Sequence, residues 1–167
     1  HFFLLGAGFM VLEVHIVSKM ALLFGTTWVV NSIVISGLLL MIVAANLLVM
    51  WKPKISVKTA YIGLFGCLLV SYITPPEMLF FDSLFYRIVA SSLVFCSPVF
   101  FAGIVFIRSF AETGFSGRAL GSNLIGSLVG GLLEALSLWT GIKALLLVAG
   151  LLYLLSMFAL RRERVIA

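Results

Sequence analysis

Long apolar runs, each close to the length that crosses a lipid bilayer, dominate this chain of 167 residues. A transmembrane helix needs about 20 consecutive apolar residues, so six crossings would use most of the chain and leave no room for a separate soluble domain. Short polar, glycine-containing or proline-containing connections separate the runs. The six apolar runs cover residues 2–24, 27–50, 57–74, 88–107, 119–138 and 141–160.

The composition agrees with this pattern, because 63% of the residues are hydrophobic and only 10% are charged. A soluble domain carries roughly 45–50% apolar and about 25% charged residues. We therefore predict an all-α fold, a polytopic membrane bundle of about six helices, and we exclude soluble Rossmann-like and barrel folds. Residues 1–167 are expected to form a single transmembrane domain. Since the chain starts at His1 and not at Met, we expect it to be part of a longer polypeptide.

Turn-forming residues separate the runs. A tight turn is predicted at residues 25–27, and Trp139-Thr140-Gly141 is expected to join the last two runs as a helical hairpin. Proline cannot continue a helix, so Pro53 and Pro75 mark the ends of the second and third runs. Pro98 lies inside the fourth run and predicts a kink there.

The aromatic stretch 78–87 lies between the third and fourth runs and is too short to span a bilayer. It carries Asp82 and Arg87 among phenylalanine and tyrosine side chains. This combination predicts a short helix that lies in the membrane interface.

Basic residues are sorted between the two sides of the predicted bundle. Six crossings place two of them, Arg87 and Lys143, on one side. Cytoplasmic loops of membrane proteins carry an excess of Lys and Arg, so the other side is predicted to be cytoplasmic, with both chain ends on it (N-in, C-in). The eight residues on that side are Lys52, Lys54, Lys58, Arg108, Arg118, Arg161, Arg162 and Arg164.

The first run contains three ionisable side chains, Glu13, His15 and Lys19. A charge at bilayer depth costs several kcal/mol and needs a partner or a function. At about 100° per residue, His15 and Lys19 share one helix face, and Glu13 lies roughly 120–160° away. Two interpretations stay open: a proton relay or ion-coupled transport site, and a buried ion pair with a hydrogen-bonded histidine that fixes helix packing.

The fifth run offers a partner for this helix. Asn123, Ser127, Gly130 and Glu134 lie within about 60° of each other on a helix. Small residues let two helices approach closely in a bilayer, and polar side chains bond across such a contact. This face is therefore expected to pack on another helix, with Glu134 pointing into the contact.

Matching depth in the membrane then predicts that Lys19 and Glu134 lie close together, directly or through water. Glu13 has no basic residue at its depth, so we expect it to be protonated or hydrogen-bonded to a neighbouring helix. In the second run, Asn31 and Asn46 lie one near each end. They are expected to form hydrogen bonds between helices or to cap a helix end.

The sequence contains no enzyme motif. Cys67 and Cys96 lie inside apolar runs without metal-ligand spacing, so neither a metal site nor another cofactor is expected. The net charge of +5 is spread over connections and forms no dense patch, so nucleic acid is not an expected partner.

Two stretches resemble a known family. The first reads HFFLLGAGFMVLE over residues 1–13 and continues as ALLFGTTWVVN over residues 21–31, and the second reads ALGSNLIGSLVGGLLE over residues 119–134. They are similar to the C-terminal membrane region of large bacterial proteins described as spermidine-synthase-like or as fused to a transporter-like membrane domain. In that family the match would span nearly the whole chain.

The resemblance implies a missing soluble domain similar to an aminopropyltransferase, which agrees with His1 being internal to a longer protein. No residue here matches that domain's pocket, so no catalytic residue is carried over. Glu13, Asn31, Asn123 and Glu134 fall at motif positions of the family. The resemblance also implies a location in the bacterial cytoplasmic (inner) membrane.

Two functions are therefore expected, and a third is weaker. The first is a non-catalytic membrane domain that, among membrane lipids, anchors and assembles with its own soluble domain or with other membrane subunits. The second is a transport module that couples protons or binds a small cation such as a polyamine, using Glu13, His15, Lys19 and Glu134. The third is an enzyme whose chemistry lies outside these residues.

Overall fold

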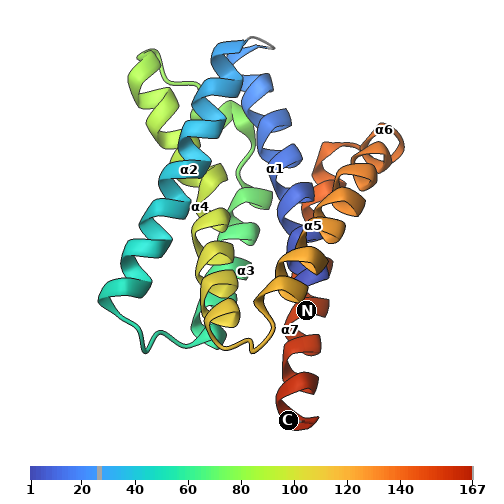
Figure 1. The fold of residues 1–167 in the computed structure, drawn as a ribbon. Coiled ribbons are helices and arrows are strands. Elements are labelled where there is room, and N and C mark those ends of the chain that lie inside the picture. Colours follow the sequence, from blue (N-terminus) through green and yellow to red (C-terminus); the bar gives the residue numbers. More distant parts are fainter. Residues whose placement is uncertain (26–27, 167) are drawn as a thin grey trace. The chain divides into compact units, whose positions relative to one another are not determined.

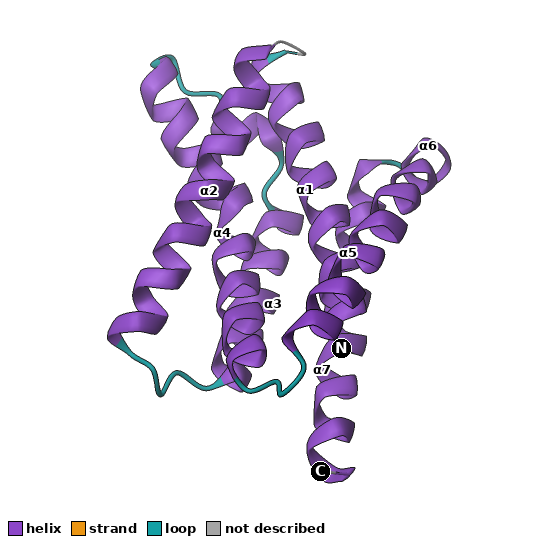
Figure 2. Cartoon of the chain, in the orientation of Figure 1, coloured by secondary structure: helices purple, strands orange, loops and turns teal. Residues whose placement is uncertain are grey.

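The computed structural model describes residues 1–25 and 28–166, with side chains for residues 1–25, 28 and 30–161. Short connections join its helices, and the described part contains no strand (Figure 1, Figure 2). The long helices are α1 (Phe2–Phe24), α2 (Trp28–Trp51), α3 (Val57–Ile73), α4 (Leu84–Ala111), α5 (Ser116–Leu133) and α7 (Ile142–Ile166). Three short helical turns are η1 (Pro76–Leu79), η2 (Glu134–Leu136) and α6 (Ser137–Thr140). The prediction of an all-α fold is confirmed.

Five helical segments of the described chain are long and apolar enough to cross a membrane. They are Phe2–Phe24, Val30–Trp51, Leu84–Ala111, Ser116–Thr140 and Ile142–Arg161. The chain is therefore a multi-pass membrane protein. α3 is apolar but has only 17 residues, at the short end of what can span a bilayer. A sixth crossing by α3 stays a prediction.

The prediction that residues 78–87 form one short helix is wrong, whereas their position in the membrane interface stays a prediction. Pro75 and Pro76 favour extended backbone in the residues before them, so α3 ends at Ile73. Proline is tolerated in the first turn of a helix, and Pro76 begins the 3₁₀ turn η1. Residues 80–83 are not helical. The carbonyl of Ser83 then accepts the N–H of Arg87 at 3.0 Å, and α4 begins directly after Ser83. α4 therefore begins earlier than the predicted run 88–107, and it also ends later, at Ala111.

Glycine permits two of the turns between helices. Gly141 has φ +82° and separates α6 from α7, which confirms the predicted helical hairpin. Gly25 has φ +83° and follows α1 directly. A left-handed conformation of this kind strains any residue with a Cβ atom. Thr26 and Thr27 of the predicted tight turn lie outside the described residues.

The fold divides into two compact units. Unit 1 contains His1–Val14 and Arg108–Ala167, and unit 2 contains His15–Ile107. α1 therefore contributes its first half to unit 1 and its second half to unit 2. That residues 1–167 form a single domain stays a prediction.

α4 is the central helix of unit 2. It approaches α2 closely, since a Cβ added at Gly37 would lie 3.3 Å from the Cys96 sulfur, and one added at Gly103 would lie 3.1 Å from the Ala45 Cβ. It also approaches α3, because a Cβ at Gly63 would overlap the Phe101 ring. Glycines thus allow α4 to pack against both neighbours.

Pro98 lies inside α4 and is buried. Because proline has no N–H, the carbonyl of Val94 loses its usual partner four residues later. The hydroxyl of Ser97 donates to this carbonyl at 3.1 Å. The side chain next to the proline therefore replaces the missing backbone hydrogen bond.

Candidate functional site

Within unit 1, α5 packs directly on the backbone of α1. A Cβ added at Gly126 would overlap the Phe3 carbonyl, and one added at Gly130 would lie within 3.0 Å of the Ala7 backbone. The reverse also holds, since a Cβ at Gly6 would overlap the Asn123 carbonyl. Glycines on both helices thus bring the two backbones into contact, as the small residues of the fifth run predicted.

Two polar side chains of α5 bond across this contact. Asn123 Nδ2 donates to the carbonyl of Phe2 at 3.2 Å, and Ser127 Oγ donates to the carbonyl of Gly6 at 3.3 Å. Both acceptors are backbone oxygens of α1. These two side chains therefore hold α5 against α1. Their hydrogen bonds also satisfy polar groups that would be costly to leave unpaired in an apolar bilayer.

α7 forms a second contact with α1 in unit 1, which was not predicted from the sequence. A Cβ at Gly8 would lie 3.2 Å from the ring of the fully buried Tyr153. His1 Nδ1 lies 2.8 Å from Ser156 Oγ and 3.0 Å from the Ser156 carbonyl oxygen. Tyr153 and Ser156 are three residues apart and share one helix face. Two polar residues at this spacing in a leucine-rich run were the only sequence signal for this contact.

The ionisable residues of α1 differ in their surroundings. In unit 2, His15 is 1% exposed and Lys19 is 3% exposed, whereas Glu13, in unit 1, is half-buried. Lys19 Nζ lies 5.9 Å from the centroid of the Phe95 ring on α4, within range of a cation–π interaction. The two residues predicted to share a face are thus both buried.

The prediction that Glu134 points into a helix contact is wrong. Glu134 begins η2 at the end of α5, and its side chain is exposed. A 3₁₀ turn advances the chain by 3.0 instead of 3.6 residues per turn, so a face calculated for a regular α-helix shifts there. Lys19 and Glu134 belong to different units, and their pairing stays a prediction.

The two asparagines of α2 are both exposed. Asn46 Nδ2 donates to the carbonyl of Ile42, one turn earlier in the same helix, at 2.9 Å. It therefore bonds within α2 and not between helices as predicted. Asn31 lies in the first turn of α2.

No group of three or more His, Cys, Asp or Glu side chains that could hold a metal ion occurs within residues 1–25 and 28–166. Cys96 is buried against α2 and Cys67 is half-buried on α3. No protein-family model, curated protein or solved structure matches this chain. The helix contacts and the buried ionisable side chains of α1 are therefore the features that bear on function.

Proposed function

We propose that this chain is a non-catalytic integral membrane domain that anchors and assembles with a partner. The observation that carries the proposal is that polar side chains of unit 1 form hydrogen bonds between helices. Asn123 and Ser127 bind backbone carbonyls of α1, and Ser156 contacts His1. Polar groups that hold helices together in this way support a scaffold more than a solute pathway.

The resemblance noted above supports a particular partner and location. The partner would be a soluble, spermidine-synthase-like domain of the same protein or other membrane subunits, in the bacterial inner membrane. The charge pattern supports an N-in, C-in orientation. Lys52, Lys54 and Lys58 are exposed at the connection between α2 and α3. Exposed lysines are typical of cytoplasmic loops. The side chains of Arg162 and Arg164 lie outside those described.

A second candidate function is favoured by one observation, the burial of His15 and Lys19 in unit 2. Buried ionisable residues of membrane helices often mark ion or proton pathways. A module that couples protons or binds a polyamine would use them together with Glu13 and Glu134. The exposure of Glu134 in η2 does not favour a compact site containing all four.

One experiment separates the two functions. Wild type and Glu13→Gln are purified from native membranes for partner identification, and are reconstituted into vesicles for spermidine and proton uptake. A scaffold predicts the same co-purifying partners for both proteins and no uptake by either. Uptake by the wild type that Glu13→Gln abolishes would overturn the scaffold and establish transport.

A pair of glycine variants tests the scaffold itself. Gly130→Leu places a large side chain against the α1 backbone and is expected to abolish partner co-purification. Gly131→Leu is the matched control on the same helix, because a Cβ there meets nothing within 4 Å. Normal assembly by a folded Gly130→Leu protein would contradict the proposed role of the α1–α5 contact.

A further inference from the structure

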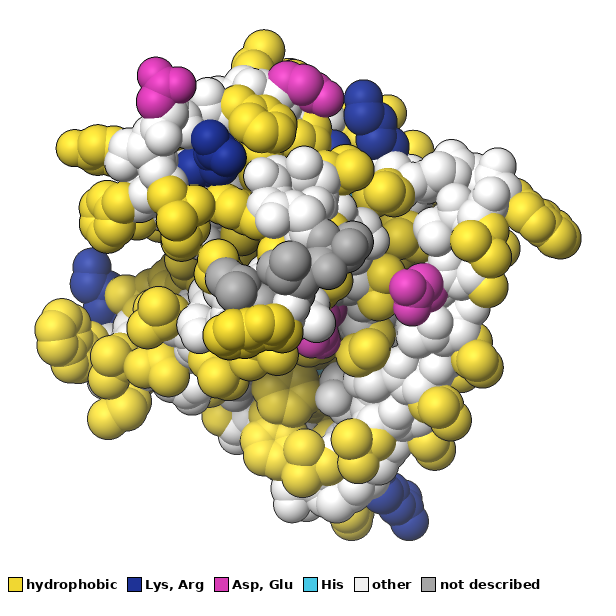
Figure 3. All heavy atoms as spheres, turned by 90° about the horizontal axis from the view of Figure 1, so that it is seen from above, with side chains coloured by type: hydrophobic (Ala, Val, Ile, Leu, Met, Phe, Trp, Pro, Cys, Tyr) yellow, Lys and Arg dark blue, Asp and Glu magenta, His cyan; other side chains and the backbone are white. Residues whose placement is uncertain are grey.

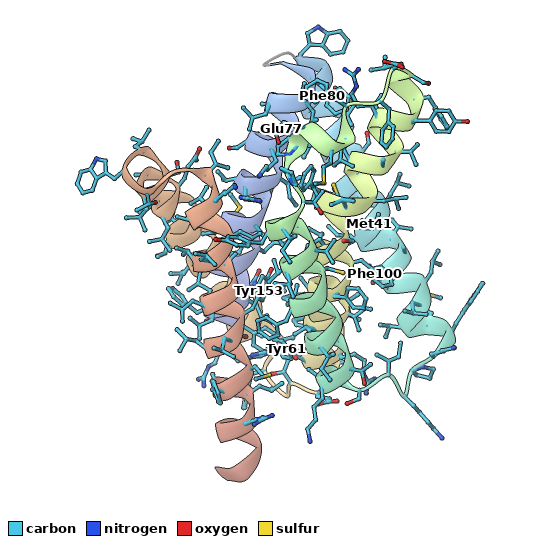
Figure 4. All side chains as sticks on the ribbon, turned by 180° about the vertical axis from the view of Figure 1, so that it is seen from behind. Met41, Tyr61, Glu77, Phe80, Phe100 and Tyr153 are labelled. Carbon is cyan, nitrogen blue, oxygen red and sulfur yellow. The ribbon has the colours of Figure 1, made fainter. Side chains whose placement is uncertain are left out.

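The segment 76–87 of unit 2 joins two apolar helices at the same end of that unit. α3 ends at Ile73 and α4 begins at Leu84, so the segment lies where both helices leave the apolar layer. Figure 4 shows Glu77 and Phe80 at this end. Pro76 and Leu79 are buried and fix the turn η1 against the unit.

Large apolar side chains of this segment point outward. Phe85 is 70% exposed and Tyr86 is 66% exposed. Hydrophobic side chains also cover much of the surface seen from above in Figure 3, and acidic and basic side chains are scattered among them. The other exposed members in the segment are Met78, Phe80, Phe81 and Leu84. In water, so much exposed apolar area would be unfavourable, at roughly 25 cal/mol per Å².

The hydrocarbon core of a bilayer is equally unsuitable for the segment. Residues 80–83 are not helical, and non-helical backbone exposed to lipid leaves N–H and C=O groups unsatisfied. Glu77 and Asp82 are exposed as well, and charged groups are costly at that depth. The boundary between lipid headgroups and acyl chains accommodates both the aromatic rings and the polar backbone.

Arg87 holds the segment in this conformation. Its Nε and Nη2 atoms donate to the carbonyl of Phe81 at 3.1 and 2.7 Å. Its guanidinium also lies 5.0 Å from the centroid of the Phe80 ring. One side chain from the first turn of α4 thus satisfies a non-helical carbonyl and fixes an exposed aromatic ring beside it.

We propose that residues 76–87 form a membrane-interface anchor that Arg87 holds in shape and that binds lipids with zwitterionic, ammonium-bearing headgroups. Charge complementarity favours these headgroups over anionic ones. Glu77 and Asp82 are exposed, whereas the guanidinium of Arg87 is directed at the segment itself. The inference rests on the membrane location of the chain and not on the scaffold function.

The test measures the depth of one tryptophan in lipid vesicles. Trp28, Trp51 and Trp139 are replaced by phenylalanine, and Phe85→Trp is introduced as the reporter. Quenching is compared between lipids that carry bromine near the headgroup and lipids that carry it near the chain end. Stronger quenching by the shallow label is expected. Absence of quenching, or stronger quenching by the deep label, would overturn the interfacial placement.

The matched control is Leu93→Trp in the same background. Leu93 is exposed on α4 eight residues further along, about 12 Å deeper in the helix. At position 93 the deep label should quench more strongly than the shallow label. The ratio of shallow to deep quenching is then the reverse of the ratio expected at position 85. Equal ratios at the two positions would show that the segment has no preferred depth.

Two further variants separate the parts of the proposal. Arg87→Lys keeps the charge but loses the two-atom donation to Phe81, and the depth preference at position 85 should fall. An unchanged ratio would overturn the role of Arg87. Brominated phosphatidylcholine should quench more than brominated phosphatidylglycerol, and the double variant Glu77→Gln with Asp82→Asn should remove this difference. Equal quenching of the unsubstituted segment by the two lipids would overturn the headgroup preference.

Discussion

At the scale of single residues, glycines of one helix have opposite surroundings. Gly126 and Gly130 touch the α1 backbone, whereas an added Cβ at Gly121 or Gly131 would meet nothing within 4 Å. The positions of the glycines alone do not separate the two kinds, because all four lie in the same small-residue stretch. Asn123 and Ser127 identify the contact face, since polar side chains avoid lipid.

Substituting glycine by alanine should therefore have opposite effects at two positions of α5. Gly126→Ala forces a methyl group into the Phe3 carbonyl and should lower the free energy of unfolding by about 1–3 kcal/mol. Gly131→Ala should leave stability unchanged or raise it by up to about 1 kcal/mol, because alanine favours helix. Unfolding in detergent micelles, followed by circular dichroism, measures both. Equal losses would argue against the α1–α5 contact.

At the scale of elements, the length of each apolar run predicted most helices correctly. α1 and α2 begin and end within one residue of the expected bounds. The segment between α3 and α4 was misjudged because its aromatic composition suggested one helix, whereas the non-helical residues 80–83 separate the turn η1 from α4. The last turn of α5 was misjudged because a change to 3₁₀ geometry leaves no clear mark in an apolar sequence.

The hydrogen bond beside Pro98 permits a test within α4. Ser97→Ala removes the donor to the Val94 carbonyl and should cost about 1 kcal/mol in a protein that keeps Pro98. In the Pro98→Ala background the new backbone N–H satisfies this carbonyl, so Ser97→Ala should cost close to nothing. A double-mutant cycle of unfolding free energies measures the coupling. Equal costs in both backgrounds would show that the serine does not replace the missing bond.

At the scale of the whole molecule, the chain is a multi-pass membrane protein, and its candidate residues are spread over two units. The buried residues Tyr153 and Ser156 were missed because residues 144–160 of α7 are otherwise apolar. Two polar side chains on one face are too weak a stripe to identify that face as buried. The predicted pairing of Lys19 with Glu134 was based on their depth in the membrane. Depth does not determine how either helix is rotated about its axis.

Orientation in the membrane can be tested with two cysteine variants. In a background without Cys67 and Cys96, Lys54→Cys and Asp82→Cys report on the two ends of unit 2, and both native side chains are exposed. A membrane-impermeant maleimide added to bacterial spheroplasts should label Asp82→Cys only. Labelling of Lys54→Cys alone would reverse the proposed N-in, C-in topology.

The glycine contact between α1 and α5 has a consequence for how the protein assembles. Glycine and alanine have no rotamers to lose, so joining these helices costs little side-chain entropy. The hydrogen bond from Asn123 to Phe2 nevertheless spans 121 positions of sequence. α1 is therefore synthesised and inserted into the membrane before α5 exists. Until α5 is inserted, the glycine-containing face of α1 is accessible to any other helix that can approach its backbone as closely.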